Sequence, residues 1–236
     1  DELQQYATSF DQLPLRQNKI VQTLEEEEIP FDFDAIVGRG GLTHPIPAGV
    51  YRVNAQMLHD TRTAIRQHVC NLGCHIAAAL ASQIDHCEAL IADPVIVDEM
   101  CAEARICGSP NMARNSVWHA LNQRATARRH ALAIGRRYED LDLIVAHLGG
   151  GITIGVHHHG RTIDVNNGLD GEGPFSPERA GTLPSSDLIH MCFSGEYTEE
   201  ELLRFVGGKA GLMAWLGTSD TREILDRIES GDEEAK

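Results

Sequence analysis

The segment 141–156 constrains the fold of this chain more than any other stretch of its sequence. It reads LDLIVAHLGGGITIGV, in which an apolar run ends in three glycines and an alternating run follows at once. The alternation predicts a second β-strand, so the two runs form a hairpin joined by a glycine turn. Glycines let the backbone approach a ligand closely, and successive N–H groups can then face an anion. An ordinary tight turn explains the same pattern, and both interpretations stay open on these residues alone.

Two familiar phosphate-binding loops do not fit this segment. The glycine loop of a dinucleotide-binding fold is followed by a helix, whereas a strand pattern follows here. The pattern GxxxxGK[ST] of the P-loop occurs nowhere in the chain. Any phosphate-binding turn in this hairpin therefore belongs to another class of fold.

Composition narrows the class of protein. The chain has 236 residues, of which 42% are hydrophobic, enough for a real core. No run approaches the roughly 20 apolar residues of a membrane span, so we expect no membrane association. A net charge of −15 argues against a nucleic-acid-binding surface. Every basic residue between 35 and 195 is arginine, which suits carboxylate or phosphate recognition, although a compositional bias explains it equally well.

The hydrophobic pattern predicts an α/β fold in which helices and strands alternate before a three-strand meander. Gly73 is expected to break or kink the second helical run. The expected helices are 9–28, 55–84, 112–135, 185–206 and 219–235, and the expected strands are 33–38, 50–54, 89–97, 141–148, 151–156 and 161–167.

The cysteines and histidines invite a metal interpretation. Cys70, Cys74 and His75, with His86 and Cys87 as candidate partners, lack the paired spacing of zinc sites, so buried reduced thiols are the favoured explanation. The tract 157–159 of three histidines is expected to form a solvated hairpin tip.

Several segments of the chain resemble those of a known family. The segment IVAHLGGGITIGVHHHGRTIDVNNGLDGEGPFSPERAGTLP is similar to a phosphate-binding segment of the butyrate kinases, a branch of the acetate kinase family. AIVGRGGLTHPIPAGVYRVN (35–54) resembles the family's substrate-side arginine loop, and the stretch 90–131 resembles its central strand and catalytic helix.

The resemblance implies a fold and a domain division. The fold is the ribonuclease H-like fold of the sugar kinase, Hsp70 and actin superfamily, in a two-domain acyl kinase. The division expected is 1–140 for the remainder of an N-terminal domain and 141–236 for the start of a C-terminal domain. Both ends of the chain read as cut, because the family's first phosphate loop and its adenosine-binding segment have no counterpart here. We therefore expect the chain alone to be inactive.

The resemblance also implies an activity: reversible transfer of the γ-phosphate of ATP to butanoate, giving butanoyl phosphate and ADP. The implied cofactors are ATP and Mg²⁺, the partners are the carboxylate and the nucleotide, and a cytoplasmic homo-oligomer is expected. The alternatives are an acetate or propionate kinase and a non-catalytic nucleotide-binding protein of the same superfamily.

Four residues match catalytic positions of the family. Arg39 is expected at the acyl carboxylate or phosphoryl group, and Arg179 at the transferring phosphoryl. Asp93 is expected to hold Mg²⁺, through water, and His119 to donate to phosphoryl oxygens. Without the resemblance, each has an ordinary structural explanation: two solvated arginines, a turn-capping carboxylate and a packed histidine.

Other residues match the binding positions. His147, Gly149, Gly150 and Gly151 match the phosphate turn. Gly40, Gly41 and Trp118 are expected in the substrate pocket, where the two glycines would leave room for a longer acid than acetate. Weaker candidates are Asn122 and Asp164 on the phosphate side and His68 near the acyl pocket; Glu172 and Glu178 could pair with Arg179 and are given no catalytic role.

Overall fold

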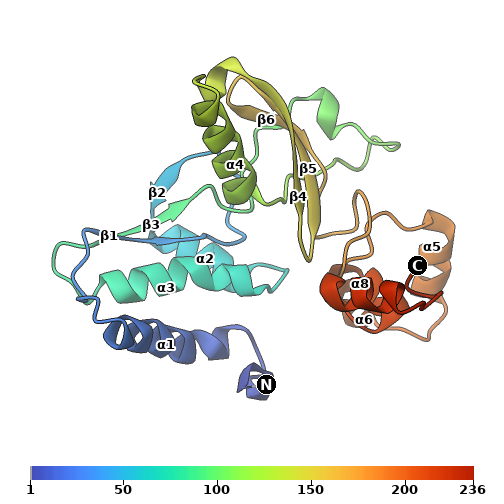
Figure 1. The fold of residues 1–236 in the computed structure, drawn as a ribbon, viewed down its shortest axis with the longest axis horizontal. Helices are drawn as coiled ribbons and strands as arrows, with labels where there is room; N and C mark the ends of the chain where they lie inside the picture. Colours follow the sequence, from blue (N-terminus) through green and yellow to red (C-terminus); the bar gives the residue numbers. More distant parts are fainter. Residues whose placement is uncertain (1) are drawn as a thin grey trace. The chain divides into compact units, whose positions relative to one another are not determined.

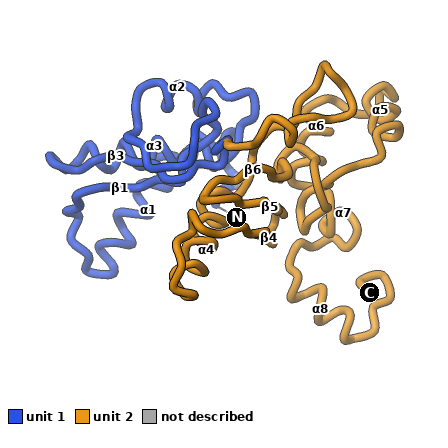
Figure 2. Tube along the Cα trace, turned by 90° about the horizontal axis from the view of Figure 1, so that it is seen from above, with its two compact units in different colours: residues 1–98 blue, residues 99–236 orange. Residues whose placement is uncertain are grey.

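The computed structural model describes residues 2–236, which form two compact units (Figure 2), one ending at Asp98 and the other beginning at Glu99. The sequence placed the division at 140/141 instead. The difference arises because residues 99–140 pack on the strands that follow them. The Glu99 carboxylate pairs with Arg124 and accepts a hydrogen bond from the Thr162 backbone N–H. Helix α4 also contributes Ala127 and Ala131 to a core beside strand β4.

The first unit is a three-stranded sheet covered by helices (Figure 1). Strand β1 runs parallel to β3, and β2 pairs with β3 in the antiparallel sense. Helix α3 packs against β1 and β3, while α1 and α2 pack against α3. The elements are α1 (Leu13–Glu26), β1 (Ala35–Gly38), β2 (Val50–Arg52), α2 (Ala55–Thr63), a 3-10 turn (Val69–Asn71), α3 (Leu72–Ala81) and β3 (Glu88–Ala92).

The expected helix 55–84 is two helices, and Gly73 is not where it breaks. The break lies between Thr63 and Val69, and Gly73 sits in the first turn of α3. Its lack of a side chain serves a close contact instead. A Cβ atom on Gly73 would collide with the carbonyl oxygen of Gly40, and one on Gly38 would collide with the carbonyl oxygen of Gly73. Helix α3 and the end of strand β1 therefore meet backbone to backbone.

The second unit contains an antiparallel sheet in the order β4-β5-β6, with α4 against β4 (Figure 1). The hairpin predicted from the glycine turn is present. The elements are α4 (Ala120–Ala133), β4 (Asp142–Leu148), β5 (Ile152–His158), β6 (Arg161–Val165), α5 (Ser185–Phe193), α6 (Glu199–Arg204), a π-helical turn (Phe205–Lys209), α7 (Leu212–Leu216) and α8 (Thr221–Glu229). Within residues 2–236, no helix combines the length and the hydropathy that crossing a bilayer requires.

Candidate active site

In the first unit, the ends of two neighbouring parallel strands bring Arg39 and Asp93 to one edge of the sheet. Gly38, the last residue of β1, pairs with Ile91 in β3. Arg39 follows β1 directly and is exposed, and Asp93 follows β3 directly. The carboxyl ends of parallel strands are where open α/β sheets place their ligands. The sequence-predicted pair therefore lies where such a sheet can bind a substrate.

Asp93 is held rigidly at its strand end. Its Oδ1 atom accepts a hydrogen bond of 2.8 Å from the Gly49 backbone N–H, and its own N–H donates to the Gly49 carbonyl at 2.9 Å. Its φ of 37° lies in the left-handed region, which is unusual for a residue other than glycine. Only 5% of Asp93 is exposed. Such strain persists where the surroundings impose it, and it clusters at functional sites.

The two glycines beside Arg39 do not leave an open pocket. A Cβ atom on Gly40 would lie 2.6 Å from the Cβ of Pro94, and one on Gly41 would lie 2.6 Å from the Cγ2 of Thr61. Gly40 also has a φ of 81°, which favours glycine. The space that the missing side chains leave is therefore already filled by the protein. The two glycines therefore serve close packing of the loop after β1, and a substrate pocket beside them stays a prediction.

In the second unit, the glycine turn is built for close approach. None of Gly149, Gly150 and Gly151 has a left-handed φ, so the turn does not require glycine for its backbone angles. Space requires it instead. A Cβ atom on Gly149 would lie 2.8 Å from the Nε2 of His147, and one on Gly151 would collide with the Arg179 guanidinium. The glycines thus let an imidazole and a guanidinium lie directly against the turn.

The long loop after β6 is hydrogen-bonded to this turn. The Gly150 carbonyl accepts hydrogen bonds from the Ser176 hydroxyl at 2.6 Å and from the Glu178 N–H at 3.3 Å. The Ser176 hydroxyl also accepts from the Arg179 N–H at 3.1 Å, and the Arg179 guanidinium donates to the Gly168 carbonyl. These bonds fix Arg179 beside Gly151.

Two histidines lie stacked beside the same turn. The rings of His119 and His147 are nearly parallel, at 8°, with their centroids 3.7 Å apart. His147 Nδ1 lies 2.8 Å from the Oδ1 of Asn122, and because an amide oxygen only accepts, this nitrogen carries a proton. His119 lies just before α4, and its Nδ1 is 3.0 Å from the Thr153 hydroxyl. The structure therefore brings four sequence-predicted elements together in this unit: His119, His147, Arg179 and the glycine turn.

Sequence reasoning missed the polar side chains that support His119. Thr153 and Gln123 are fully buried and are hydrogen-bonded to each other, and Gln123 also contacts His157. The signal that could have found Thr153 is its place on β5 between Ile152 and Ile154, which puts it on the sheet face that His147 shares. Gln123 follows His119 by four residues, a helical spacing that no motif marked.

Several other expectations need correction. Trp118 is 2% exposed and meets the His157 ring edge to face at 5.9 Å, so it packs in the core, and its place in a substrate pocket stays a prediction. Glu172 pairs with Arg114 instead of Arg179, and Asp164 pairs with that same Arg114 at 2.9 Å. The Arg114 ion pairs therefore tie the end of β6 to the loop that follows it.

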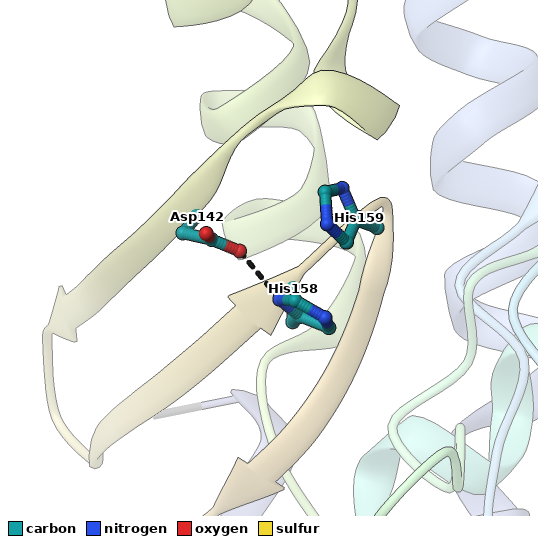
Figure 3. A group of neighbouring side chains, drawn as sticks. All are labelled: Asp142, His158 and His159. Atoms are coloured by element: carbon teal, nitrogen blue, oxygen red, sulfur yellow. Dashed lines mark hydrogen bonds and ion pairs between the residues drawn. The ribbon is translucent and has the colours of Figure 1, made fainter.

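The histidine tract 157–159 divides into three different environments. His157 is fully buried, contrary to the expected solvated tip, because β5 continues through His158. The turn uses only His159 and Gly160, both with a positive φ. Figure 3 shows His158 facing Asp142 across the strands, with the Nδ1 and Oδ1 atoms 2.5 Å apart, and His159 beside them. These three exposed groups lie at the end of the hairpin opposite the glycine turn.

The cysteines of the first unit differ in burial. Cys74 is buried, and burial raises the pKa of its thiol to about 11, so the buried-thiol interpretation holds for Cys74. Among the described residues, Asp142, His158 and His159 are the group whose donor atoms lie close enough for a metal. His68, a weaker candidate for the acyl pocket, accepts a hydrogen bond from the Cys70 N–H and begins the 3-10 turn before α3.

Comparison with known proteins decides the family. Residues 112–236 match the acetokinase family. The chain is 56% identical over 236 residues to a probable butyrate kinase of Bacteroides thetaiotaomicron, covering all of this chain and 67% of that protein. It belongs to the acetokinase family. It is also 47% identical to butyrate kinase 1 of Clostridium acetobutylicum, over 98% of this chain and 66% of the relative.

Solved structures agree on the fold. A propionate kinase from Francisella tularensis superposes with a TM-score of 0.70 at 20% identity, over 94% of this chain and 59% of that one. An acetate kinase from Porphyromonas gingivalis gives 0.66 at 19% identity, over 85% and 52%. The family resemblance and the fold class predicted from the sequence are confirmed. The chain spans about two thirds of the length of the curated relatives.

Proposed function

We propose that the protein carrying this chain is a carboxylate kinase that transfers the γ-phosphate of ATP reversibly to butanoate, giving butanoyl phosphate and ADP. The observation that carries the proposal is in the second unit, where the Arg179 guanidinium and the stacked His119 and His147 rings lie against a triple-glycine turn. The choice of butanoate as the acid rests on the relatives named butyrate kinase. A cytoplasmic location and a homo-oligomer stay predictions.

The second unit provides the groups that a migrating phosphoryl needs. Phosphoryl transfer depends on positioning and on positive charge at the equatorial oxygens rather than on covalent chemistry by the protein. Arg179 brings a permanent cation, held in place by its bonds to Ser176 and Gly168. His119 and His147 bring N–H donors on two stacked rings. We assign these three side chains to the phosphoryl group, with the turn lying beneath it.

The first unit provides the candidate carboxylate and metal groups. Arg39 is exposed at the end of β1, so its planar fork can bind the carboxylate of the acid in a bidentate manner. Asp93 offers a buried carboxylate at the end of β3, and Mg²⁺ prefers such oxygens while keeping several water ligands. The residue present therefore fits the ion. When bound, Mg²⁺ neutralises charge on the nucleotide phosphates.

The acid and the site can be tested in one assay on the full-length protein. Butanoyl phosphate is trapped with hydroxylamine, and acids of two to five carbons are compared at saturating ATP. We expect turnover with butanoate and a fall in kcat of about 10²–10³-fold for Arg179→Ala, the size of effect seen when one transition-state contact is removed. Arg137→Ala, which removes an exposed arginine that pairs only loosely with Glu139, serves as the control and should match the wild type. The proposal would be contradicted if none of the acids yielded hydroxamate, or if Arg179→Ala and Arg137→Ala reacted at equal rates.

A further inference from the structure

A line of four buried polar side chains runs behind His119. From the ring outward, Thr153 lies 3.0 Å from His119 Nδ1, and Gln123 Nε2 lies 2.8 Å from the Thr153 hydroxyl. Gln123 Oε1 is 3.0 Å from His157 Nε2, and His157 Nδ1 is 2.6 Å from the Tyr138 hydroxyl. Thr153, Gln123 and His157 are fully buried, and Tyr138 is 3% exposed. Thr153, Gln123 and His157 therefore each have a hydrogen-bond partner on both sides, and Tyr138 is the last member of the line.

The direction of these bonds is fixed at Gln123. Its amide nitrogen donates to the Thr153 hydroxyl and also to the Thr153 carbonyl at 2.9 Å, so Oε1 faces His157. An amide oxygen only accepts, and His157 Nε2 must therefore carry a proton. Burial, with a smaller effect from Arg124, lowers the pKa of His157 to about 4. The ring is thus neutral near pH 7, and its Nδ1 accepts from the Tyr138 hydroxyl.

The same direction sets the proton at the other end. The Thr153 hydroxyl is fully buried and accepts from Gln123, and within residues 2–236 the acceptor that its own proton can reach is His119 Nδ1. A neutral imidazole that accepts at Nδ1 carries its proton on Nε2. His147 is fixed the opposite way, with the proton on Nδ1 toward Asn122. The two stacked rings are therefore held as different tautomers by different partners.

We propose that Thr153, Gln123, His157 and Tyr138 are positioning residues, a relay that holds His119 as the Nε2–H tautomer and so aims an N–H at the phosphoryl oxygens. The inference rests on the proposed function only in assigning the phosphoryl group to His119. A donor fixed before the reaction requires no reorganisation as charge develops. The other tautomer would present a lone pair to an anionic oxygen, which is repulsive.

Stability alone does not account for this relay. Buried polar groups are costly unless all are hydrogen-bonded, and apolar side chains of the same shape would fill the same space. Gly155 shows how closely the relay is packed, because a Cβ atom there would collide with Gln123 Oε1. A complete and tightly enclosed polar line that ends on the histidine of the candidate site is the arrangement expected of a positioning device.

The relay can be tested with two isosteric substitutions in the full-length protein. Thr153→Val removes the hydroxyl that contacts His119. Thr61→Val removes an equally buried hydroxyl in the first unit, where it lies 3.0 Å from His75 Nε2 and contacts no member of the relay. We expect Thr153→Val to lower kcat for butanoyl phosphate formation about 10- to 100-fold, less than loss of a transition-state donor itself. The KM values for ATP and butanoate should stay within about threefold, and Thr61→Val should match the wild type.

The tautomer is measured directly by NMR of protein labelled with ¹⁵N-histidine, with the His119 signals identified by their loss in His119→Asn. We expect wild-type His119 to be protonated at Nε2 and bare at Nδ1. In Gln123→Glu, the carboxylate accepts the Thr153 hydroxyl proton, so the His119 proton should move to Nδ1. A wild-type ring protonated at Nδ1, or equal kcat values for the two threonine variants in an active enzyme, would overturn the relay. An inactive wild-type enzyme with an Nε2–H ring would overturn the proposed function and leave the relay supported.

Discussion

The two faces of the β4–β6 sheet differ in a way that reverses the usual pattern. The face toward α4 carries His147, Thr153 and His157, all buried or half-buried. The opposite face carries apolar cross-strand pairs, Ile144 with Val156 and Leu148 with Ile152. Ile144 is 76% exposed and Leu148 is 74% exposed. Antiparallel sheets normally bury their apolar face and solvate their polar one.

The difference teaches that the covered face is organised around hydrogen bonds. One end of that side holds a hydrophobic cluster, where Ala127, Ala131 and Tyr138 meet Leu143 and Val145. The centre is filled by Thr153, Gln123 and His157, whose partners are one another. Substitutions on the covered face should therefore disturb both stability and catalysis, whereas those on the open face should disturb neither.

The largest effect on stability is expected from Gly155→Ala, on the covered face. The added methyl group would collide with Gln123 Oε1 and approach His157 Nε2 at 3.1 Å. Overpacking together with a broken buried hydrogen bond should lower the free energy of unfolding by roughly 2–5 kcal/mol. Urea unfolding measures it, with Ala146→Val on the exposed face as the control. A loss below about 1 kcal/mol for Gly155→Ala would show that the covered face is loosely packed.

A smaller effect is expected from pH, through His157. Its pKa is lowered to about 4 by burial, while the unfolded chain titrates near 6.5. As pH falls below 6.5 the unfolded state binds a proton that the folded state refuses, so stability is full above that pH and is lost toward pH 4. The loss between pH 7 and pH 5 should be on the order of 2 kcal/mol.

The control for this pH effect is His157→Gln, which has no titrating group at that position. Burial and Arg62 also lower the pKa of His75, which adds a loss of the same sign in both proteins. The urea midpoint of the wild type should therefore fall more steeply from pH 7 to pH 5 than that of the variant. If the urea midpoints of the wild type and of His157→Gln fell equally with pH, His157 would have to bind a proton in the folded state as readily as in the unfolded state.

The smallest effect is expected on the open face, from Ile144→Thr. The side chain is largely exposed and threonine keeps the β-branched shape that suits a strand. The free energy of unfolding of the 236-residue chain should change by less than about 1 kcal/mol. A larger loss would show that this face is covered, and the contrast between the two faces would then disappear.

The hairpin and its glycine turn could be predicted from the sequence because a period of two and three adjacent glycines are local signals. Gly73 was misjudged because its reason is tertiary: the backbone of Gly40 lies against it. The environment of His157 was missed for a similar reason. Nothing local reveals that the turn after β5 needs only His159 and Gly160, which leaves His157 inside the strand.

The residues of the candidate site likewise fall into those that the sequence predicts and those that depend on tertiary packing. His119, His147, Arg179 and the three glycines stand in segments that the family resemblance covers, and the structure groups them in one unit. The relay residues Thr153 and Gln123 are common polar residues in a strand and a helix, and their role depends on the packing of α4 against β4. The close packing of Gly40 against Pro94 and of Gly41 against Thr61 could not be predicted either, because these neighbours are distant in the sequence.

We propose that the covered polar face presents His119 to the transferring phosphoryl group. The most direct test is kcat for ATP-dependent butanoyl hydroxamate formation by full-length His119→Asn against the wild type. We expect kcat to fall about 10²–10³-fold, as for loss of one transition-state donor, with the KM for butanoate nearly unchanged. A kcat within threefold of the wild-type value would contradict it.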